Sequence, residues 1–207
     1  MFGERGFDAV TIADIARGAD VAVQTVFNHF ATKEELFFDG RADWVDGAAR
    51  AVRECPAGVP PLSALREHLT ASVSGYLTWL SDPAHRAVIA TLEASPALRA
   101  YERELHHECV RRLSEALSEA AAAVPQRNAA ETQLMAPLTA AVWMAAIRAL
   151  VVEQRSRVAQ GGDDAAMTEA VALLAERVLQ KFEGMTPAAA APRAQVTGWP
   201  AGARRAG

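Results

Sequence analysis

"VQTVFNHFATKEEL", residues 23–36, holds a short amphipathic pattern followed by the start signal of another helix. Its first apolar residues have the i, i+3, i+4, i+7 spacing of one buried helix face: Val23, Val26, Phe27 and Phe30. This spacing predicts a helix over 23–30. The opposite face carries hydrogen-bonding side chains and no acid: Gln24, Thr25, Asn28 and His29. Such a face either binds a polar partner or is a solvated surface.

The residues on both sides of this helix predict two more helices. Thr11 with Asp14 three residues later is typical of a capping box, and apolar residues then follow at helical spacing to about residue 19. The sequence GADVA, residues 18–22, predicts a tight break. Thr32 with Glu35 predicts a second capping box, and we expect the helix that it starts to continue to about residue 54.

Two short helices joined by a tight turn have the layout of a helix-turn-helix. In that layout the N-terminal end of the second helix enters the major groove of DNA. Gln and Asn side chains pair with adenine edges, Thr bonds a base or touches a thymine methyl, and His meets a phosphate. The polar face of 23–30 is therefore suited to reading DNA.

The whole chain of 207 residues predicts an all-α protein, because half of it is hydrophobic and strand-favouring runs are scarce. CPAGVPP, residues 55–61, is a linker signal. The amphipathic segments after it predict helices over these ranges: 62–80, 83–93, 95–123, 128–158 and 165–182. We expect Pro137 to kink or shorten the fourth of these at its start. Residues 187–207, rich in Ala, Pro, Gly and Arg, are typical of a disordered tail.

Charge and cysteine content indicate a soluble cytoplasmic protein with no membrane partner. The net charge is −4, and the two cysteines, Cys55 and Cys109, are expected to be reduced thiols. No signal peptide opens the chain, and the longest apolar run, 134–147, is too short to span a bilayer.

The contiguous stretch over residues 6–36, GFDAVTIADIARGADVAVQTVFNHFATKEEL, resembles the DNA-binding signature of the TetR family of bacterial transcriptional regulators. The resemblance implies an N-terminal helix-turn-helix domain over 1–44. It further implies a larger helical domain over 45–184 that binds a small effector and forms the dimer, and a tail over 185–207. In that family effector binding releases the DNA.

The resemblance implies a set of DNA-contacting residues: Thr11, Gln24, Thr25, Asn28, His29 and Lys33. Gln24 and Thr25 would face bases, whereas His29 and Lys33 match phosphate-contacting positions. Phe27 stands where the family usually has a Tyr, so it packs and makes no hydroxyl contact. Asp20 stands where the family usually has Gly, and Asp tolerates the left-handed backbone of such a turn better than most residues.

The first 40 residues are unusually acidic for a DNA-binding unit, with three basic and seven acidic side chains. Only MFGER precedes the Gly-aromatic pair, whereas the family has a further helix and a basic arm there. Because phosphate neutralisation supplies most non-specific affinity, we expect this chain to bind DNA weakly and the native protein to carry more residues upstream. An intact mass matching Met1–Gly207 in protein purified from its host would contradict that expectation.

The helices after residue 61 carry aromatic and Met residues that are either core or the lining of an effector pocket. The candidate effector-binding set is Trp44, Tyr76, Trp79, His107, Trp143 and Met144. Glu104 and His107 have an i, i+3 spacing that metal ligands also use, but no second such pair exists, so a surface salt-bridge cluster is the preferred interpretation. We predict no metal, no cofactor and no catalytic residue, hence no enzyme.

The last two predicted helices suit a dimer interface. Met167, Val171, Leu174, Val178 and Phe182 form one stripe, and small residues are frequent over 136–149. Both surfaces could instead pack within their own domain. The sequence thus predicts a TetR-like repressor, a homodimer that a small-molecule effector releases from a palindromic double-stranded DNA operator. The alternative is a helical ligand-binding protein or enzyme that has lost DNA binding.

Overall fold

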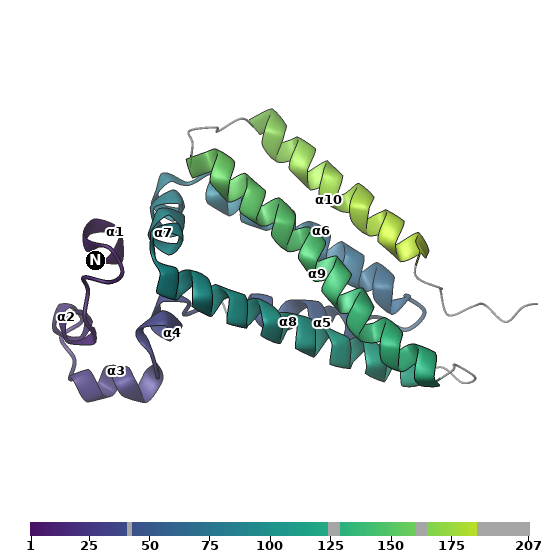
Figure 1. The fold of residues 1–207 in the computed structure, drawn as a ribbon, viewed down its shortest axis with the longest axis horizontal. Helices are drawn as coiled ribbons and strands as arrows, with labels where there is room; N and C mark the ends of the chain where they lie inside the picture. The colour runs from purple at the N-terminus through teal and green to yellow at the C-terminus, as the bar shows by residue number, and fades with distance from the viewer. Residues whose placement is uncertain (41–42, 124–128, 160–164, 186–207) are drawn as a thin grey trace, which may run out of the picture.

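The computed structural model describes residues 1–40, 43–123, 129–159 and 165–185, which form ten helices and no strand (Figure 1). This confirms the all-α prediction. Four short helices form the N-terminal unit: α1 (Phe2–Arg5), α2 (Ile12–Gly18), α3 (Val23–His29) and α4 (Lys33–Phe37). Six longer ones form the rest: α5 (Asp43–Arg53), α6 (Pro61–Leu80), α7 (Pro83–Ala94), α8 (Pro96–Ala122), α9 (Ala129–Ala159) and α10 (Ala165–Met185). The tail expected over 187–207 lies outside the described residues.

The helix-turn-helix layout is present in α2 and α3. The predicted capping box at α2 is confirmed: Thr11 Oγ1 accepts from the Asp14 amide at 3.1 Å, and the Thr11 amide donates to Asp14 Oδ2 at 3.0 Å. Asp20 has φ 54°, so it takes the left-handed conformation expected at this turn. Local signals in the sequence therefore fixed both the start of α2 and its separation from α3.

The capping box at α2 predicts an unusual acid titration. Hydrogen bonds from the Thr11 backbone and hydroxyl, with Arg17 and Arg5 nearby, lower the pKa of Asp14 from 3.8 to about 2. Because the folded pKa is depressed, the stabilisation is complete above the ordinary pKa and is lost as pH falls through about 2. We expect the NMR shift of the Thr11 amide proton to titrate with a midpoint near pH 2 and Asp14→Asn to remove the titration. A midpoint near 3.8 would contradict this assignment.

The helix predicted from residue 32 to about 54 is wrong in extent. The structure ends α4 at Phe37, Gly40 takes φ 68°, and α5 begins at Asp43. A positive φ cannot continue a right-handed helix, which accounts for the break. The second capping box also differs: Thr32 accepts from the Glu35 amide as predicted, but Glu35 Oε2 accepts from Ala31 N at 2.6 Å rather than from Thr32.

The predicted buried stripe of α3 is also largely wrong. Val26 is buried at 7% exposure and Phe30 is half-buried, but Val23 and Phe27 are 41% and 47% exposed. The reason is that α3 packs mainly against α2, at the edge of the molecule, so one neighbour covers only part of its apolar face (Figure 1). The amphipathic spacing correctly predicted a helix at α3, but it could not predict which neighbouring helices would bury its apolar face.

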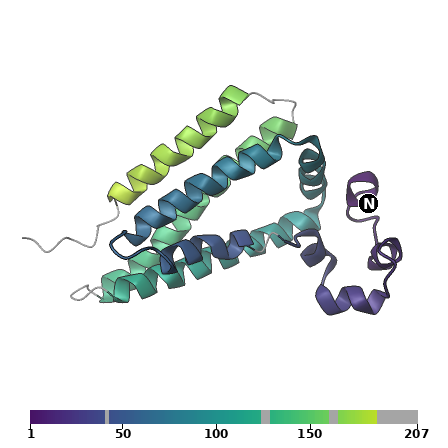
Figure 2. The same ribbon diagram turned by 180° about the vertical axis from the view of Figure 1, so that it is seen from behind.

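The six longer helices form an elongated bundle in which α8 and α9 are the longest members (Figure 2). α5 packs along α8, α9 crosses α8, and α10 lies against α6 and α9. Their common core contains fully buried side chains from four helices: Leu65, Leu113, Trp143 and Leu179. Pro61, Pro83 and Pro96 each stand in the first turn of a helix, where a missing backbone N–H costs nothing. α9 continues through Pro137.

The outer face of α9 and α10 is apolar and exposed. Leu134, Leu138 and Val142 are exposed on α9, and Met167, Leu173, Leu174 and Met185 on α10. The predicted α10 stripe is divided: Val171 and Phe182 pack half-buried against the core and Val178 is half-buried, whereas Met167 and Leu174 are exposed. The apolar run over 134–147 is too short to cross a membrane. It belongs, however, to a longer helical segment, Gln133–Val158, which is long and apolar enough to do so by length and composition.

Candidate functional site

The polar face of α3 is exposed and contains no acid. Gln24, Thr25, Asn28 and His29 are all solvent-exposed, as predicted from their spacing. Gln24 Nε2 donates to Asn28 Oδ1 at 3.1 Å, one helical turn apart. Each amide side chain retains further donors and acceptors, so this bond aligns the pair without using up its hydrogen-bonding capacity. One face of α3 can therefore present two amides, a hydroxyl and an imidazole to a polar partner.

Thr11 and Lys33 both have partners within the protein. Thr11 caps α2 and remains exposed. Lys33 Nζ donates to the carbonyls of Phe7 and Val10 at 2.8 and 3.0 Å and lies 4.1 Å from the Phe7 ring centroid. Two of the three ammonium donors thus tie the segment before α2 to α4. Sequence spacing gave no sign of this second role.

The arginines of the N-terminal unit also pair internally. Arg17 Nη1 lies 3.0 Å from Asp14 Oδ1, and Arg5 Nη2 lies 3.6 Å from Asp14 Oδ2. These exposed ion pairs are weak, so either arginine can leave Asp14 and pair with another anion. They nevertheless leave little unbalanced positive charge on this unit, consistent with the excess of acids seen in the sequence.

A chain of aromatic rings joins the N-terminal unit to α8. Phe7 and Phe37 have ring centroids 5.9 Å apart, Phe37 and Phe38 5.2 Å, and Phe38 stacks on Tyr101 at 5.5 Å. These rings belong to a small apolar cluster that also includes Leu92 and Leu98. The ring of Phe38 thus contacts both Phe37 of α4 and Tyr101 of α8.

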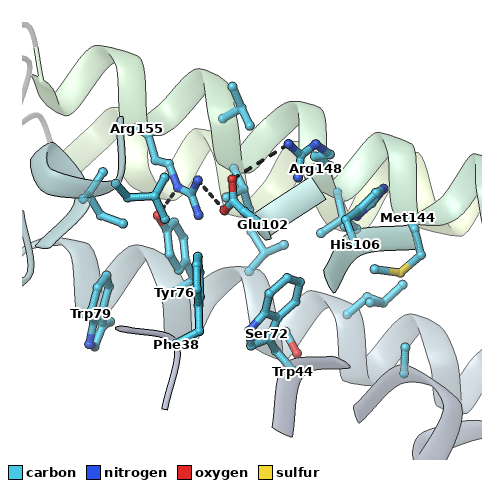
Figure 3. Close-up of a pocket in the computed structure, with 18 of the residues that line it drawn as sticks. Phe38, Trp44, Ser72, Tyr76, Trp79, Glu102, His106, Met144, Arg148 and Arg155 are labelled. Carbon is cyan, nitrogen blue, oxygen red and sulfur yellow. Dashed lines mark hydrogen bonds and ion pairs between the residues drawn. The ribbon is translucent and has the colours of Figure 1, made fainter. Parts of the chain in front are cut away.

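A cavity of about 540 Å³, partly open to solvent, lies between helices of the bundle, with Phe38 on its wall (Figure 3). Its size is typical of small-molecule sites, and most of its wall is apolar. Four of the six predicted effector-binding residues line it: Trp44, Tyr76, Trp79 and Met144. The structure places the other two candidates elsewhere: Trp143 is in the core, 6.4 Å from the Phe182 ring, and His107 is exposed.

One end of the cavity is polar, and three of its residues were not among the predicted effector-binding residues: Glu102, Arg148 and Arg155. Arg155 is 8% exposed; its Nε donates to Tyr76 Oη at 2.6 Å, and its Nη1 lies 2.7 Å from Glu102 Oε1. Arg148 Nη2 lies 3.8 Å from Glu102 Oε2 (Figure 3). Arg148 and Arg155 are seven residues apart on α9, a spacing that puts both on one face. That pattern could have revealed them.

Two imidazoles on the cavity wall are neutral at physiological pH. Burial lowers the pKa of His106, and the nearby Arg148 lowers it further. Burial, with Arg50, lowers the pKa of His68. His68 also packs against α5 at Gly47, where a Cβ would lie only 2.7 Å from His68 Nε2. The absence of a side chain at residue 47 thus makes room for the imidazole.

Comparison with known proteins supports the assignment of the N-terminal unit. Residues 1–39 match the model of the family described as "Bacterial regulatory proteins, tetR family". The chain is 37% identical over 75 residues to the HTH-type transcriptional repressor KstR2 of Mycobacterium tuberculosis, covering 35% of this chain and 36% of that protein. It is 29% identical over 104 residues to the HTH-type transcriptional regulator TcmR of Streptomyces glaucescens, covering 48% and 46%. The matches thus span less than half the length of these relatives.

Two solved structures resemble the chain over most of its length. One is a TetR-family transcriptional regulator from Mesorhizobium loti, with a TM-score of 0.49 and 17% identity over 88% of this chain and 89% of that one. The other is the transcriptional regulator FadR from Bacillus subtilis, solved in complex with stearoyl-CoA, with a TM-score of 0.48 and 19% identity over 87% and 91%.

Proposed function

We propose that this chain, which carries the DNA-binding unit of the TetR family, is a transcriptional repressor that a small molecule releases from a palindromic operator. The observation that carries the proposal is the exposed, acid-free face of α3, next to α2 in a helix-turn-helix. Residues 1–44 would form the DNA-binding domain and residues 45–184 the effector-binding and dimerisation domain, with the boundary inside α5. The tail would begin at 185. The protein would be cytoplasmic and not an enzyme.

The proposed DNA contacts follow from the positions of the exposed side chains. Gln24 and Thr25, at the N-terminal end of α3, face bases, and Asn28 extends the same face. His29 bonds a phosphate at the other end. Thr11 at the start of α2 and the remaining donor of Lys33 bond phosphates of the flanking backbone.

The apolar outer face of α9 and α10 is the proposed dimer interface. Leu138 and Leu173 are 56% and 52% exposed within one chain, and α9 is strongly apolar although much of it is uncovered. Pairing α9 and α10 with those of a second copy would bury these side chains in a four-helix arrangement. A two-fold dimer presents two α3 helices to two half-sites, which is why the operator is expected to be palindromic.

The cavity is the proposed effector site, and Phe38 is the proposed link to the DNA-binding unit. A ligand in the cavity would touch Phe38, whose ring also stacks on Tyr101 and contacts Phe37. A ligand that fits better when Phe38 is displaced favours a different placement of α4, and hence of α2 and α3. The half-sites then no longer match the two recognition helices.

Replacing Phe38 by Leu should uncouple the two sites. Leu retains apolar bulk but cannot stack on Tyr101, so we expect the fold to be kept at a cost of about 0.5–3 kcal/mol. We expect normal operator binding but at least about tenfold less release by saturating effector. A gel shift measures this, with a compound first identified by quenching of Trp44 and Trp79 fluorescence. Val151→Ala is the matched control on the cavity wall: it should weaken effector binding but keep full release at saturation.

The test of the function itself is a gel shift on the DNA just upstream of this gene, at low and physiological salt. The proposed function predicts a discrete complex that an operator fragment with scrambled half-sites does not form. The acidic N-terminal unit favours the alternative, a helical ligand-binding protein or enzyme without DNA binding. Finding equal affinity for intact and scrambled DNA, or none for either, would support that alternative.

A further inference from the structure

The polar end of the cavity has an excess of positive charge. Arg148 and Arg155 from α9 meet one carboxylate, Glu102 from α8 (Figure 3). The imidazoles of His68 and His106 add no charge, because burial keeps them neutral. Glu93 Oε1 also approaches Arg155 Nη1, at 3.7 Å, but it is 41% exposed, does not line the cavity and is screened by water. The cavity interior therefore holds two cations for one anion.

Glu102 is already occupied by this pair of arginines. Its side chain is 9% exposed, with one oxygen 2.7 Å from Arg155 and the other 3.8 Å from Arg148. A second cation brought into the cavity would have to displace one of them. A cationic ligand would therefore face net repulsion from the guanidinium groups.

Arg155 still lacks part of its hydrogen bonding. Its buried Nη1 atom is paired with Glu102 Oε1 at 2.7 Å, and this contact occupies at most one of the two Nη1 N–H groups. A buried guanidinium with an unmet donor is costly, and an anionic acceptor would remove the cost. Arg148 is 31% exposed and can turn to the same acceptor. Together the two groups could hold a planar carboxylate by charge-assisted bonds.

We propose that the cavity takes an amphipathic carboxylate: an apolar, ring-bearing body with a single anionic head bound between Arg148 and Arg155. The body would lie among Trp44, Val73 and Ile147, where the wall is apolar. This inference rests on the proposed function only in taking the cavity as the effector site. It adds the chemical class of the effector, which nothing in the family match specifies.

Three probes with the same phenylhexyl carbon skeleton differ only in the head group, so they report its contribution to binding. They are 6-phenylhexanoate, 6-phenylhexan-1-ol and 6-phenylhexylamine, which are anionic, neutral and cationic at pH 7.5. Isothermal titration on the full chain, supported by quenching of Trp44 and Trp79, gives the three dissociation constants. We expect the acid to bind about tenfold or more tightly than the alcohol, and the amine to bind most weakly. Equal or tighter binding of the alcohol or amine would overturn the proposal, as would no binding of any probe.

Variants at α9 locate the head group. Arg148→Met should weaken the acid about tenfold while changing the alcohol by less than about threefold. Arg148→Lys, which keeps the charge, should retain part of the preference for the acid over the alcohol. It replaces Arg148→Met in the test if circular dichroism shows that the Met variant does not fold. Arg157→Met removes the same charge from the exposed side of α9, where Arg157 pairs with Glu153, and should change neither probe. Unchanged acid affinity in a folded Arg148→Met variant would overturn the assignment.

Failure of this inference is distinguishable from failure of the proposed function. The upstream gel shift needs no ligand, so it tests DNA binding alone. If the protein binds its operator specifically but prefers the alcohol, the repressor function is supported and the carboxylate effector is contradicted. If the protein binds 6-phenylhexanoate through Arg148 but does not bind DNA, the carboxylate site is supported and the repressor function is contradicted.

Discussion

Replacing Gln24 and Thr25 together by Ala should abolish specific operator binding and leave the melting temperature almost unchanged. Both side chains are exposed at the N-terminal end of α3, and among the described residues the hydrogen bond of Gln24 to Asn28 is the side-chain contact that is lost. Each lost base contact costs about 1–3 kcal/mol of discrimination, so the pair should reduce the specific affinity about a hundredfold or more. Stability should change by less than about 0.5 kcal/mol, because exposed surface substitutions rarely do more.

The quantity to measure is the ratio of affinities for the operator and for a scrambled fragment, at one fixed salt concentration. The control is Glu67→Ala with Thr78→Ala, two exposed positions on α6, away from α3 and from the proposed dimer face. The control should bind as the native protein does. If the Gln24 and Thr25 variant keeps the native ratio, the polar face of α3 is merely solvated and the repressor proposal fails.

Introducing Glu at Leu138 and Leu173 should dissociate the dimer and thereby weaken operator binding. The two leucines are 56% and 52% exposed on the outer face of α9 and α10. In a paired interface each new carboxylate would be buried without a partner, at a cost of at least about 1–3 kcal/mol. We expect the dimer dissociation constant to rise about a hundredfold or more. In the separated chain the new side chains meet water, so helix content should be native.

Sedimentation equilibrium at several concentrations measures the dissociation constant, and circular dichroism reports the helix content. Arg103→Glu, at an exposed position on α8, is the control for added negative charge and should remain dimeric. A double variant that stays dimeric would show that the chain pairs through another surface. The apolar face of α9 and α10 would then need a different explanation.

Signals confined to a few neighbouring residues predicted the fold well. Thr11 and Asp14 specified the start of α2, and the prolines at 61, 83 and 96 marked the starts of α6, α7 and α8, because capping and missing N–H groups act within one turn. The break between α4 and α5 was missed because the apolar periodicity continues across it. A lone Gly40 is compatible with a helix until its φ is known.

The candidate sites were predictable in composition but not in detail. Trp44, Tyr76, Trp79 and Met144 were identified because large apolar side chains are the usual lining of a pocket. His107 was chosen over its neighbour His106, yet a one-residue step turns a side chain by about 100° around a helix, and His106 is the one on the wall. Likewise, the exposure of Phe27 depends on which helices surround α3, which no local pattern specifies.

The close packing of Gly47 against His68 has a consequence for how selectivity could change over time. A methyl group at residue 47 would force the imidazole to turn, and a ring at the end of a side chain can turn without disturbing the helices. The wall beside Ser72 and Trp44 would then change shape although the altered residue does not line the cavity. If the cavity is the effector site, its chemical preference would therefore depend on residue 47 as well, although this position does not line the wall.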